Sequence, residues 1–157
     1  MKKIVVGIGE GKIAFNDDAL ISYALGSCIG VCLYDAYHHI GAMAHIVLPH
    51  HPTDKPIQDK YKYADLGVHN LMKEMVKAGA NRRHIVAKIA GGAEMFTSVT
   101  PQWQIGKQNI QTVCDILKRE KIQIIAEDVG ENYGRTITFY ALDGRLEIHS
   151  LKKDRVI

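Results

Sequence analysis

Cys28 is the residue of this sequence best placed to perform covalent chemistry. It follows Gly26 and Ser27 at the start of an apolar strand, where backbone N–H groups are not yet paired in a sheet and can face a ligand. A thiol with a pKa near ~8.5 is only a few per cent thiolate at neutral pH, so a reactive cysteine needs a histidine or a dipole beside it. The other two cysteines, Cys32 and Cys114, lie in apolar patterns and are predicted to pack in the core.

A hairpin between two apolar strands predicts the histidine partner of Cys28. We expect the strand that begins at Cys28 to pair antiparallel with the segment GAMAHIVLP, with Asp35 opposite His38 at a tight turn. That register places His45 directly opposite Cys28, with Cβ atoms about 4.5–5.5 Å apart, which allows a thiol–imidazole hydrogen bond. A slip of one residue would remove the contact. The alternative for His45 is a core histidine that bonds a backbone carbonyl.

A metal site is a second chemistry that the histidines suggest, because five of them fall within fourteen positions. Imidazole binds zinc and nickel readily. However, no pair has the i, i+4 helical spacing of a strong zinc motif, and two of the five lie in a proline-rich surface loop over residues 49–60. We therefore expect no metal in the site and keep the cluster as an alternative. Its members are His38, His39, His45, His50 and His51.

Gly91 and Gly92 follow a predicted strand in the segment AGGAEMF, residues 90–96. The segment lacks the Lys-Ser/Thr of a P-loop and the spacing of a dinucleotide fingerprint. Two interpretations stay open: a tight turn where backbone segments approach closely, or a wall of the site around Cys28.

Two segments have the apolar periodicity of amphipathic helices, residues 61–78 with Gly79 as a C-terminal cap, and residues 105–121. Short runs of small and β-branched residues predict strands, and Asp143-Gly144 predicts a hairpin near the C-terminus. The fold class is α/β of the α+β type: one domain over residues 1–157, a mixed or antiparallel β-rich sandwich with the two main helices on one face. The strands are expected at 2–9, 19–25, 27–35, 41–49, 84–92, 122–130 and 135–151.

Composition excludes several classes of function. Of the 157 residues, 46% are hydrophobic and 24% are charged, and no apolar run approaches the ~20 residues of a membrane helix, so no membrane insertion is expected. The net charge of +3 is small and its basic residues are scattered, which argues against nucleic acid as a partner. The N-terminal apolar run ends without a cleavage site, so we expect a cytoplasmic protein with free thiols.

Six motifs, in order and spacing, resemble the CheD family of chemoreceptor glutamine deamidases of bacterial and archaeal chemotaxis. They are LGSCIGVCLYD, GAMAHIVLP, KYADLGVHNLM, AGGAEMF, IGKQNIQ and DVGENYGR, and the resemblance covers Ile4 to Leu151. It implies a hydrolase that converts glutamine side chains on the cytoplasmic helices of receptors to glutamate by attack of a cysteine thiolate, paired with an imidazolium, without a metal or organic cofactor. It also implies a fold similar to the catalytic domain of deamidating cytotoxic necrotizing toxins.

The resemblance assigns roles to particular residues. The family's cysteine and histidine match Cys28 and His45, and the hydroxyl of its triad matches Ser22, where the family more often has threonine. Ser22 would then orient the ring, and backbone N–H groups of Cys28 and of the Gly26-Ser27 turn would hold the oxyanion. Glu131, in DVGENYGR, stands where the family tends to have glycine.

The resemblance also implies partners. These are the cytoplasmic domains of chemoreceptors as substrate, and a CheC-type phosphatase of the response regulator, whose docking segment would occupy the deamidase site. Hydrolysis of receptor glutamyl methyl esters would use the same site, because only the leaving group changes. The rival expectation is a largely non-catalytic adaptor that binds the phosphatase, in which the thiol is incidental.

Overall fold

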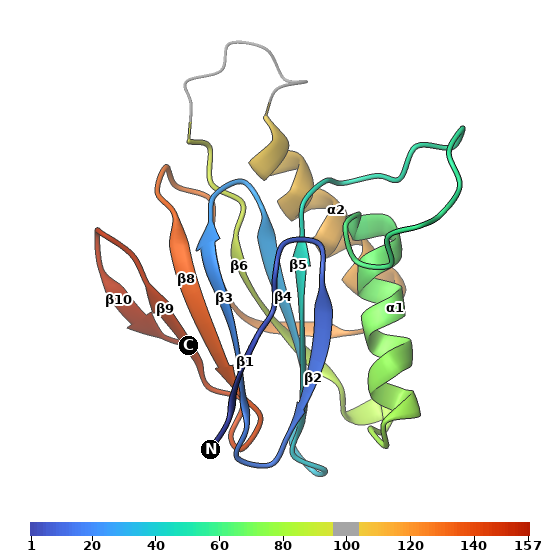
Figure 1. Cartoon of the computed structure of the whole chain (residues 1–157), viewed down its shortest axis with the longest axis vertical. Helices are drawn as coiled ribbons and strands as arrows, with labels where there is room; N and C mark the ends of the chain where they lie inside the picture. The colour runs from blue at the N-terminus through green and yellow to red at the C-terminus, as the bar shows by residue number, and fades with distance from the viewer. Residues whose placement is uncertain (96–103) are drawn as a thin grey trace.

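Two packed β-sheets form the body of the protein, and two helices cover the outer face of one of them (Figure 1). The computed structural model describes residues 1–95 and 104–157. The first sheet has the order β1 (Lys3–Val5), β3 (Ala19–Leu25), β8 (Arg135–Tyr140), β9 (Leu146–His149) and β10 (Asp154–Val156). The second has the order β2 (Gly11–Phe15), β5 (Ile40–Ile46), β4 (Ile29–Asp35), β6 (Val86–Gly91) and β7 (Gln123–Val129). The pairs β1–β3 and β6–β7 are parallel and the remaining pairs antiparallel, which confirms the predicted mixed sandwich.

The helices are α1 (Ala64–Lys77) and α2 (Ile105–Arg119), and a short 3-10 helix, η1 (Arg82–His84), precedes β6. Both main helices lie within the segments whose periodicity predicts them. In α1 the buried residues include Val68, Leu71 and Met75, which share one face of the helix. Neither helix has the length and apolar composition needed to cross a membrane, and the same holds for the rest of the described chain.

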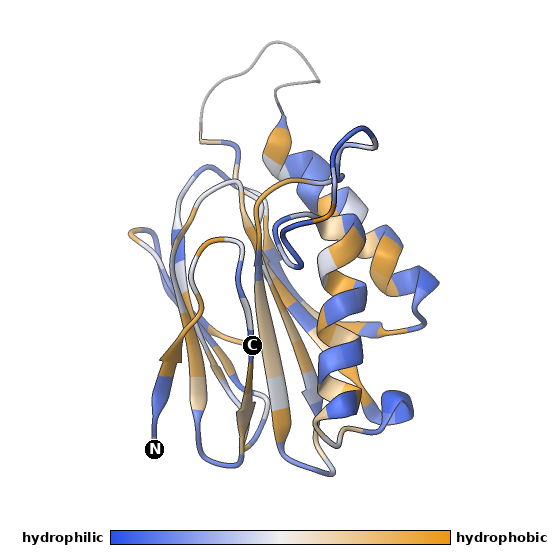
Figure 2. Cartoon of the chain, turned by 45° about the vertical axis from the view of Figure 1, so that its right-hand side comes forward, coloured by the Kyte–Doolittle hydropathy of each residue, from blue (hydrophilic) through white to orange (hydrophobic). Residues whose placement is uncertain are grey.

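Strand β4 is buried along its whole length and divides the core in two. Successive side chains of a strand point to opposite faces, so Val31 and Leu33 pack in the layer under the helices, whereas Cys32 packs between the sheets with Phe139 of β8. The predicted core position of Cys32 is confirmed. Cys114 is partly buried and packs against the layer under the helices. Figure 2 shows the apolar residues concentrated on the strands and hydrophilic residues along the outer side of α1.

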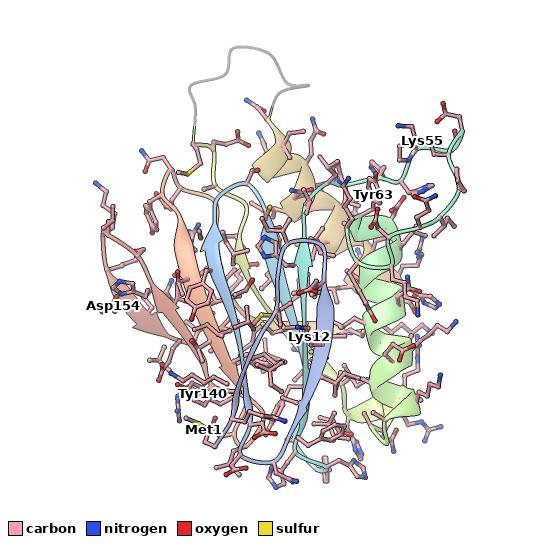
Figure 3. All side chains as sticks on the ribbon, in the orientation of Figure 1. Met1, Lys12, Lys55, Tyr63, Tyr140 and Asp154 are labelled. Atoms are coloured by element: carbon pink, nitrogen blue, oxygen red, sulfur yellow. The ribbon has the colours of Figure 1, made fainter. Side chains whose placement is uncertain are left out.

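The proline-rich segment predicted as a surface loop connects β5 to α1. Residues 53–60 are exposed, and Lys55 lies at the tip of the loop, away from both sheets (Figure 3). Near its base, the His51 ring meets the Tyr63 ring edge-on at 5.1 Å between centroids.

The turn between β4 and β5 corrects the predicted register. Asp35 pairs with Ile40 rather than with His38, so the turn has four residues, and His45 lies opposite Gly30 rather than opposite Cys28. The physical reason is the Asp35 side chain, whose Oδ1 accepts the N–H groups of the second and third residues after it and supports the wider turn. Because the error is two residues, Cys28 stays on the same face as His45, at the diagonal position.

Gly30 permits the close approach of the two sheets beside His45. A Cβ atom at this position would lie 2.3 Å from Cδ1 of Ile137, which reaches across from β8. We therefore expect Gly30→Ala to lower the free energy of unfolding by about 1–3 kcal/mol, since Ile137 must leave its packed position. Urea denaturation measures the change.

The matched control for this prediction is Gly134→Ala. The nearest atom to a Cβ at Gly134 is 3.6 Å away, an ordinary contact, so this variant should lose no stability. Equal stability of the Gly30 and Gly134 variants would show that the sheets have room beside His45.

Candidate active site

Ser22 on β3 and His45 on β5 face each other across the space between the sheets. Oγ of Ser22 lies 2.8 Å from Nδ1 of His45 and 2.8 Å from the carbonyl oxygen of Val6. Because a carbonyl only accepts, the Ser22 hydroxyl donates to Val6 and accepts the N–H at Nδ1 of His45. This arrangement selects the neutral tautomer with its proton on Nδ1 and leaves Nε2 free to act as a base.

The surroundings of His45 hold the ring in place and keep it neutral. Its backbone N–H donates to the carbonyl of Glu10 (2.9 Å), and its own carbonyl accepts the N–H of Gly9 (3.0 Å), so the segment between β1 and β2 runs alongside it. The residue is 2% exposed. Burial lowers the pKa of His45 below its usual value, because desolvation disfavours the imidazolium.

Gly91 and Gly92 pack against the backbone of Cys28. Gly92 N–H donates to the carbonyl of Cys28 (2.8 Å), and the next N–H along the chain donates to the carbonyl of Gly26 (2.9 Å). Both glycines have positive φ, and a Cβ at Gly91 would lie 2.3 Å from the Cys28 oxygen. The close backbone approach predicted for this turn is therefore confirmed, and the contact is with Gly26 and Cys28. Phe96, the last residue of AGGAEMF, lies outside the described residues.

Asn109 on α2 joins the two segments that carry the cysteine and the histidine, a role that the sequence analysis does not assign. Its Nδ2 donates to the carbonyl of Ser27 (2.9 Å), next to Cys28, and to the carbonyl of Val47 (2.9 Å), just after β5. The side chain is fully buried. The sequence gives one sign of this role: Asn109 is an amide residue four positions before Val113, on the buried stripe of an amphipathic helix.

Cys28 is half-buried, in contrast to the fully buried Cys32. Burial raises the pKa of the Cys28 thiol, while a hydrogen bond from its own backbone N–H acts in the opposite direction. Within residues 1–95 and 104–157, the N–H groups of Ser27 and Cys28 donate to no backbone carbonyl, and the Cys28 N–H faces its own sulfur.

Burial disfavours the charged form of both members of the candidate pair, raising the pKa of Cys28 and lowering that of His45. The structure has no hydrogen bond between the sulfur of Cys28 and the His45 ring. The diagonal separation, with Cα atoms about 7–8 Å apart, leaves the thiol and the ring on one face of the sheet.

The five-histidine alternative for a metal site is wrong, because the fold separates these residues. His45 bonds Ser22, His39 bonds the carbonyl of Leu142, and His50 lies in the loop before α1. Among the described residues, one group of three side chains has the spacing for a shared ion, and only one of the five histidines belongs to it.

Glu131 has a backbone conformation that glycine adopts most easily. Its φ is +62°, in the left-handed region, and its carbonyl accepts the N–H of Glu94 (2.9 Å). The preceding Gly130 donates its N–H to the carbonyl of Gly91 (2.9 Å), so this loop supports the Gly91-Gly92 turn beside Cys28. A glycine would fit the same turn without steric cost, in agreement with the residue that the resemblance leads one to expect.

Comparison with known proteins decides the family. A family model described as CheD chemotactic sensory transduction matches residues 47–150. A probable chemoreceptor glutamine deamidase CheD from Caldanaerobacter subterraneus subsp. tengcongensis is 40% identical over 152 residues, covering 96% of this chain and 94% of the relative. A relative of the same name from Clostridium botulinum is 41% identical (93% and 91% covered), and one from Clostridium acetobutylicum is 39% identical (96% and 92% covered).

The chain belongs to the CheD family. The family model begins after His45, but the three CheD relatives match more than nine-tenths of the chain and so include the segment from Ser22 to His45. The resemblance seen in the six motifs is confirmed.

Removing the Asn109 amide tests how this CheD chain holds its site. Asn109→Ala leaves the carbonyls of Ser27 and Val47 without a donor and should lower the free energy of unfolding by about 2–4 kcal/mol. Amide hydrogen exchange of Gly92 and Ala93, whose N–H groups donate to the carbonyls of Cys28 and Gly26, should become more than about tenfold faster. Val113→Ala, a buried change on the same helix without a bond to the site, is the control. Equal exchange at Gly92 and Ala93 in the two variants would contradict the positioning role.

The charge state of Cys28 in the CheD site has a kinetic signature. For a neutral thiol with a raised pKa, the thiolate fraction grows about tenfold per pH unit below that pKa. Iodoacetamide alkylation of Cys28, followed by peptide mass spectrometry, should therefore accelerate by roughly that factor per unit between about pH 6.5 and 8.5. A rate independent of pH in this range would show a preformed thiolate–imidazolium pair instead.

Proposed function

We propose that this protein is a chemoreceptor glutamine deamidase, a cysteine-dependent amidohydrolase with Cys28 as nucleophile. The observation that carries the proposal is the hydrogen bond from His45 Nδ1 to Ser22, which leaves Nε2 as a base on the same face as Cys28. The names of the CheD relatives give the reaction and its substrate class. The expected likeness to the catalytic domain of deamidating toxins, and a cytoplasmic location, belong to this proposal.

The first half of the reaction forms a thioester. Nε2 of His45 accepts the proton of the Cys28 thiol as the sulfur attacks the carboxamide carbon of a receptor glutamine. The carbonyl oxygen becomes an oxyanion, which the N–H groups of Cys28 and Ser27 hold. One such donor is typically worth about 2.7–4 kcal/mol. The His45 imidazolium then gives its proton to the departing nitrogen, the C–N bond breaks and ammonia leaves.

The second half restores the thiol. Nε2 of His45 accepts a proton from water as the water oxygen attacks the thioester carbon. The C–S bond breaks, the proton returns to sulfur and the receptor side chain leaves as glutamate. The residues needed for both halves are Cys28, His45 and Ser22, with Ser22 keeping the Nδ1 proton in place. The cycle needs no metal or organic cofactor.

Each turnover adds one negative charge to a receptor helix and creates a carboxylate that can be methylated. Like charges on packed helices repel, so the change can shift the receptor's signalling equilibrium. The same site would hydrolyse receptor glutamyl methyl esters, releasing methanol in place of ammonia. A CheC-type phosphatase belongs to this proposal as a partner whose docking segment competes with the receptor for the site.

Deamidation of receptor cytoplasmic fragments, followed by peptide mass spectrometry, tests the proposal. Cys28→Ala should abolish glutamate formation. Ser22→Ala should lower kcat by about 10–100-fold, because the Nδ1 proton of His45 loses its acceptor, whereas Ser22→Thr keeps the hydroxyl and should keep most of the activity.

Cys114→Ala is the matched control, a thiol on α2 outside the site, and should be fully active. Deamidation by Cys28→Ala at the wild-type rate would refute the cysteine mechanism. A wild-type protein that binds the phosphatase but deamidates no receptor would favour the adaptor alternative.

A further inference from the structure

Asp35, His38 and His84 meet at the end of β4 opposite to Cys28. Their ligand atoms all lie within 4.8 Å of one another. Asp35 ends β4, His38 lies in the following turn, and His84 ends η1, so the fold brings together residues that are distant in sequence. Seven residues of extended strand, at about 3.3 Å each, place this group on the order of 23 Å from Cys28. The group is therefore separate from the candidate active site.

The protein holds the Asp35 carboxylate in a fixed orientation. Its side chain is fully buried, and three backbone N–H groups bond it: those of Tyr37 (3.0 Å), His38 (3.3 Å) and Asn81 (2.8 Å). These bonds leave the carboxylate oxygens directed toward the rings of His38 and His84.

The two imidazoles differ in how well the protein satisfies them. Nδ1 of His38 lies 2.8 Å from Oδ2 of Asp35, a good hydrogen bond. Nδ1 of His84 lies 3.6 Å from Oδ1, too far for a hydrogen bond, and this buried atom has no partner. Tyr37 stacks on the His84 ring with centroids 4.0 Å apart and holds it in this position. The hydrogen bonds of the turn around Asp35 account for the position of the His38 ring. They give Nδ1 of His84 no hydrogen-bond partner.

We propose that Asp35, His38 and His84 bind a divalent transition-metal ion of the zinc class. Two imidazole nitrogens and one carboxylate oxygen are a donor set that zinc accepts, with bonds of about 2.0–2.2 Å and a fourth position for water. The ion replaces the proton between His38 and Asp35, which requires those atoms to separate by only about half an ångström. His38 is in a turn and its side chain is 47% exposed, so it can move and water can reach the ion.

Binding would connect the β4–β5 turn to η1 and so stabilise the fold. An ion that binds only the folded state raises the melting temperature, and zinc at ~100 times its Kd should raise it by about 5 °C or more. Magnesium, which prefers oxygen ligands, should leave it unchanged.

Isothermal titration of chelator-treated protein with zinc chloride alone, at pH 7.5, tests the site. All variants carry Cys28→Ala and Cys114→Ala, so that partly exposed thiols do not compete for the ion. We expect one ion per chain, and at least tenfold weaker binding in both His84→Ala and His38→Ala. His38 is exposed and His84 is half-buried, so both variants should fold. Asp35→Asn is not used, because a change at this buried position can disrupt the fold.

His50→Ala is the matched control, an exposed histidine 3.8 Å from Asp65 in a different part of the molecule, and should bind zinc as the parent does. The proposal is overturned if the parent binds no zinc, if either His38→Ala or His84→Ala binds as tightly as the parent, or if His50→Ala loses the same affinity.

Discussion

The hydrogen bond between Ser22 and His45 joins the two sheets, and the candidate site exists only when the sheets pack in one arrangement. Ser22 belongs to the sheet of β3 and β8, whereas His45 belongs to the sheet of β4 and β5. The tautomer of His45 is therefore set by a residue of the opposite sheet. The requirement explains why Gly30 faces Ile137 beside His45, because a larger residue there would push the sheets apart where this bond must form.

Strand β4 separates the candidate active site, at its start, from the Asp35–His38–His84 group, at its end. Its residues are all buried, which is typical of a central strand covered on both faces. At its start, the glycine turn bonds the carbonyl of Cys28 and the Asn109 amide bonds that of the neighbouring Ser27; at its end, Asp35 organises a turn and the two imidazoles. The same strand therefore connects the candidate active site to the proposed ion site.

Sequence periodicity predicted the helices well, because each has one apolar stripe that must face a sheet. The hairpin register could not be predicted to the residue, since the length of its turn depends on hydrogen bonds of the Asp35 side chain that no hydrophobic pattern encodes. Strands β2 and β10 were missed: only one of the five residues of β2 is buried, and the three residues of β10 are exposed. Ser22 entered only through the family resemblance, because a hydroxyl in a strand gives no sign of a partner in another sheet. Asn109 was missed because an isolated amide in a helix does not reveal what it bonds.

Burial gives the proposed chemistry a cost that the neighbouring dipoles must offset. Proton transfer from Cys28 to His45 creates two charges where water is scarce, and the directions of both pKa values favour the neutral pair. In the transition state, however, the negative charge moves from sulfur to the substrate oxygen, beside the N–H groups of Ser27 and Cys28. These donors are held by the bonds that fix the surrounding carbonyls, so they need no reorganisation as the charge develops. In the proposed mechanism the thiol therefore loses its proton only when a carboxamide occupies the site, which would suit an enzyme whose substrate is one kind of side chain on another protein.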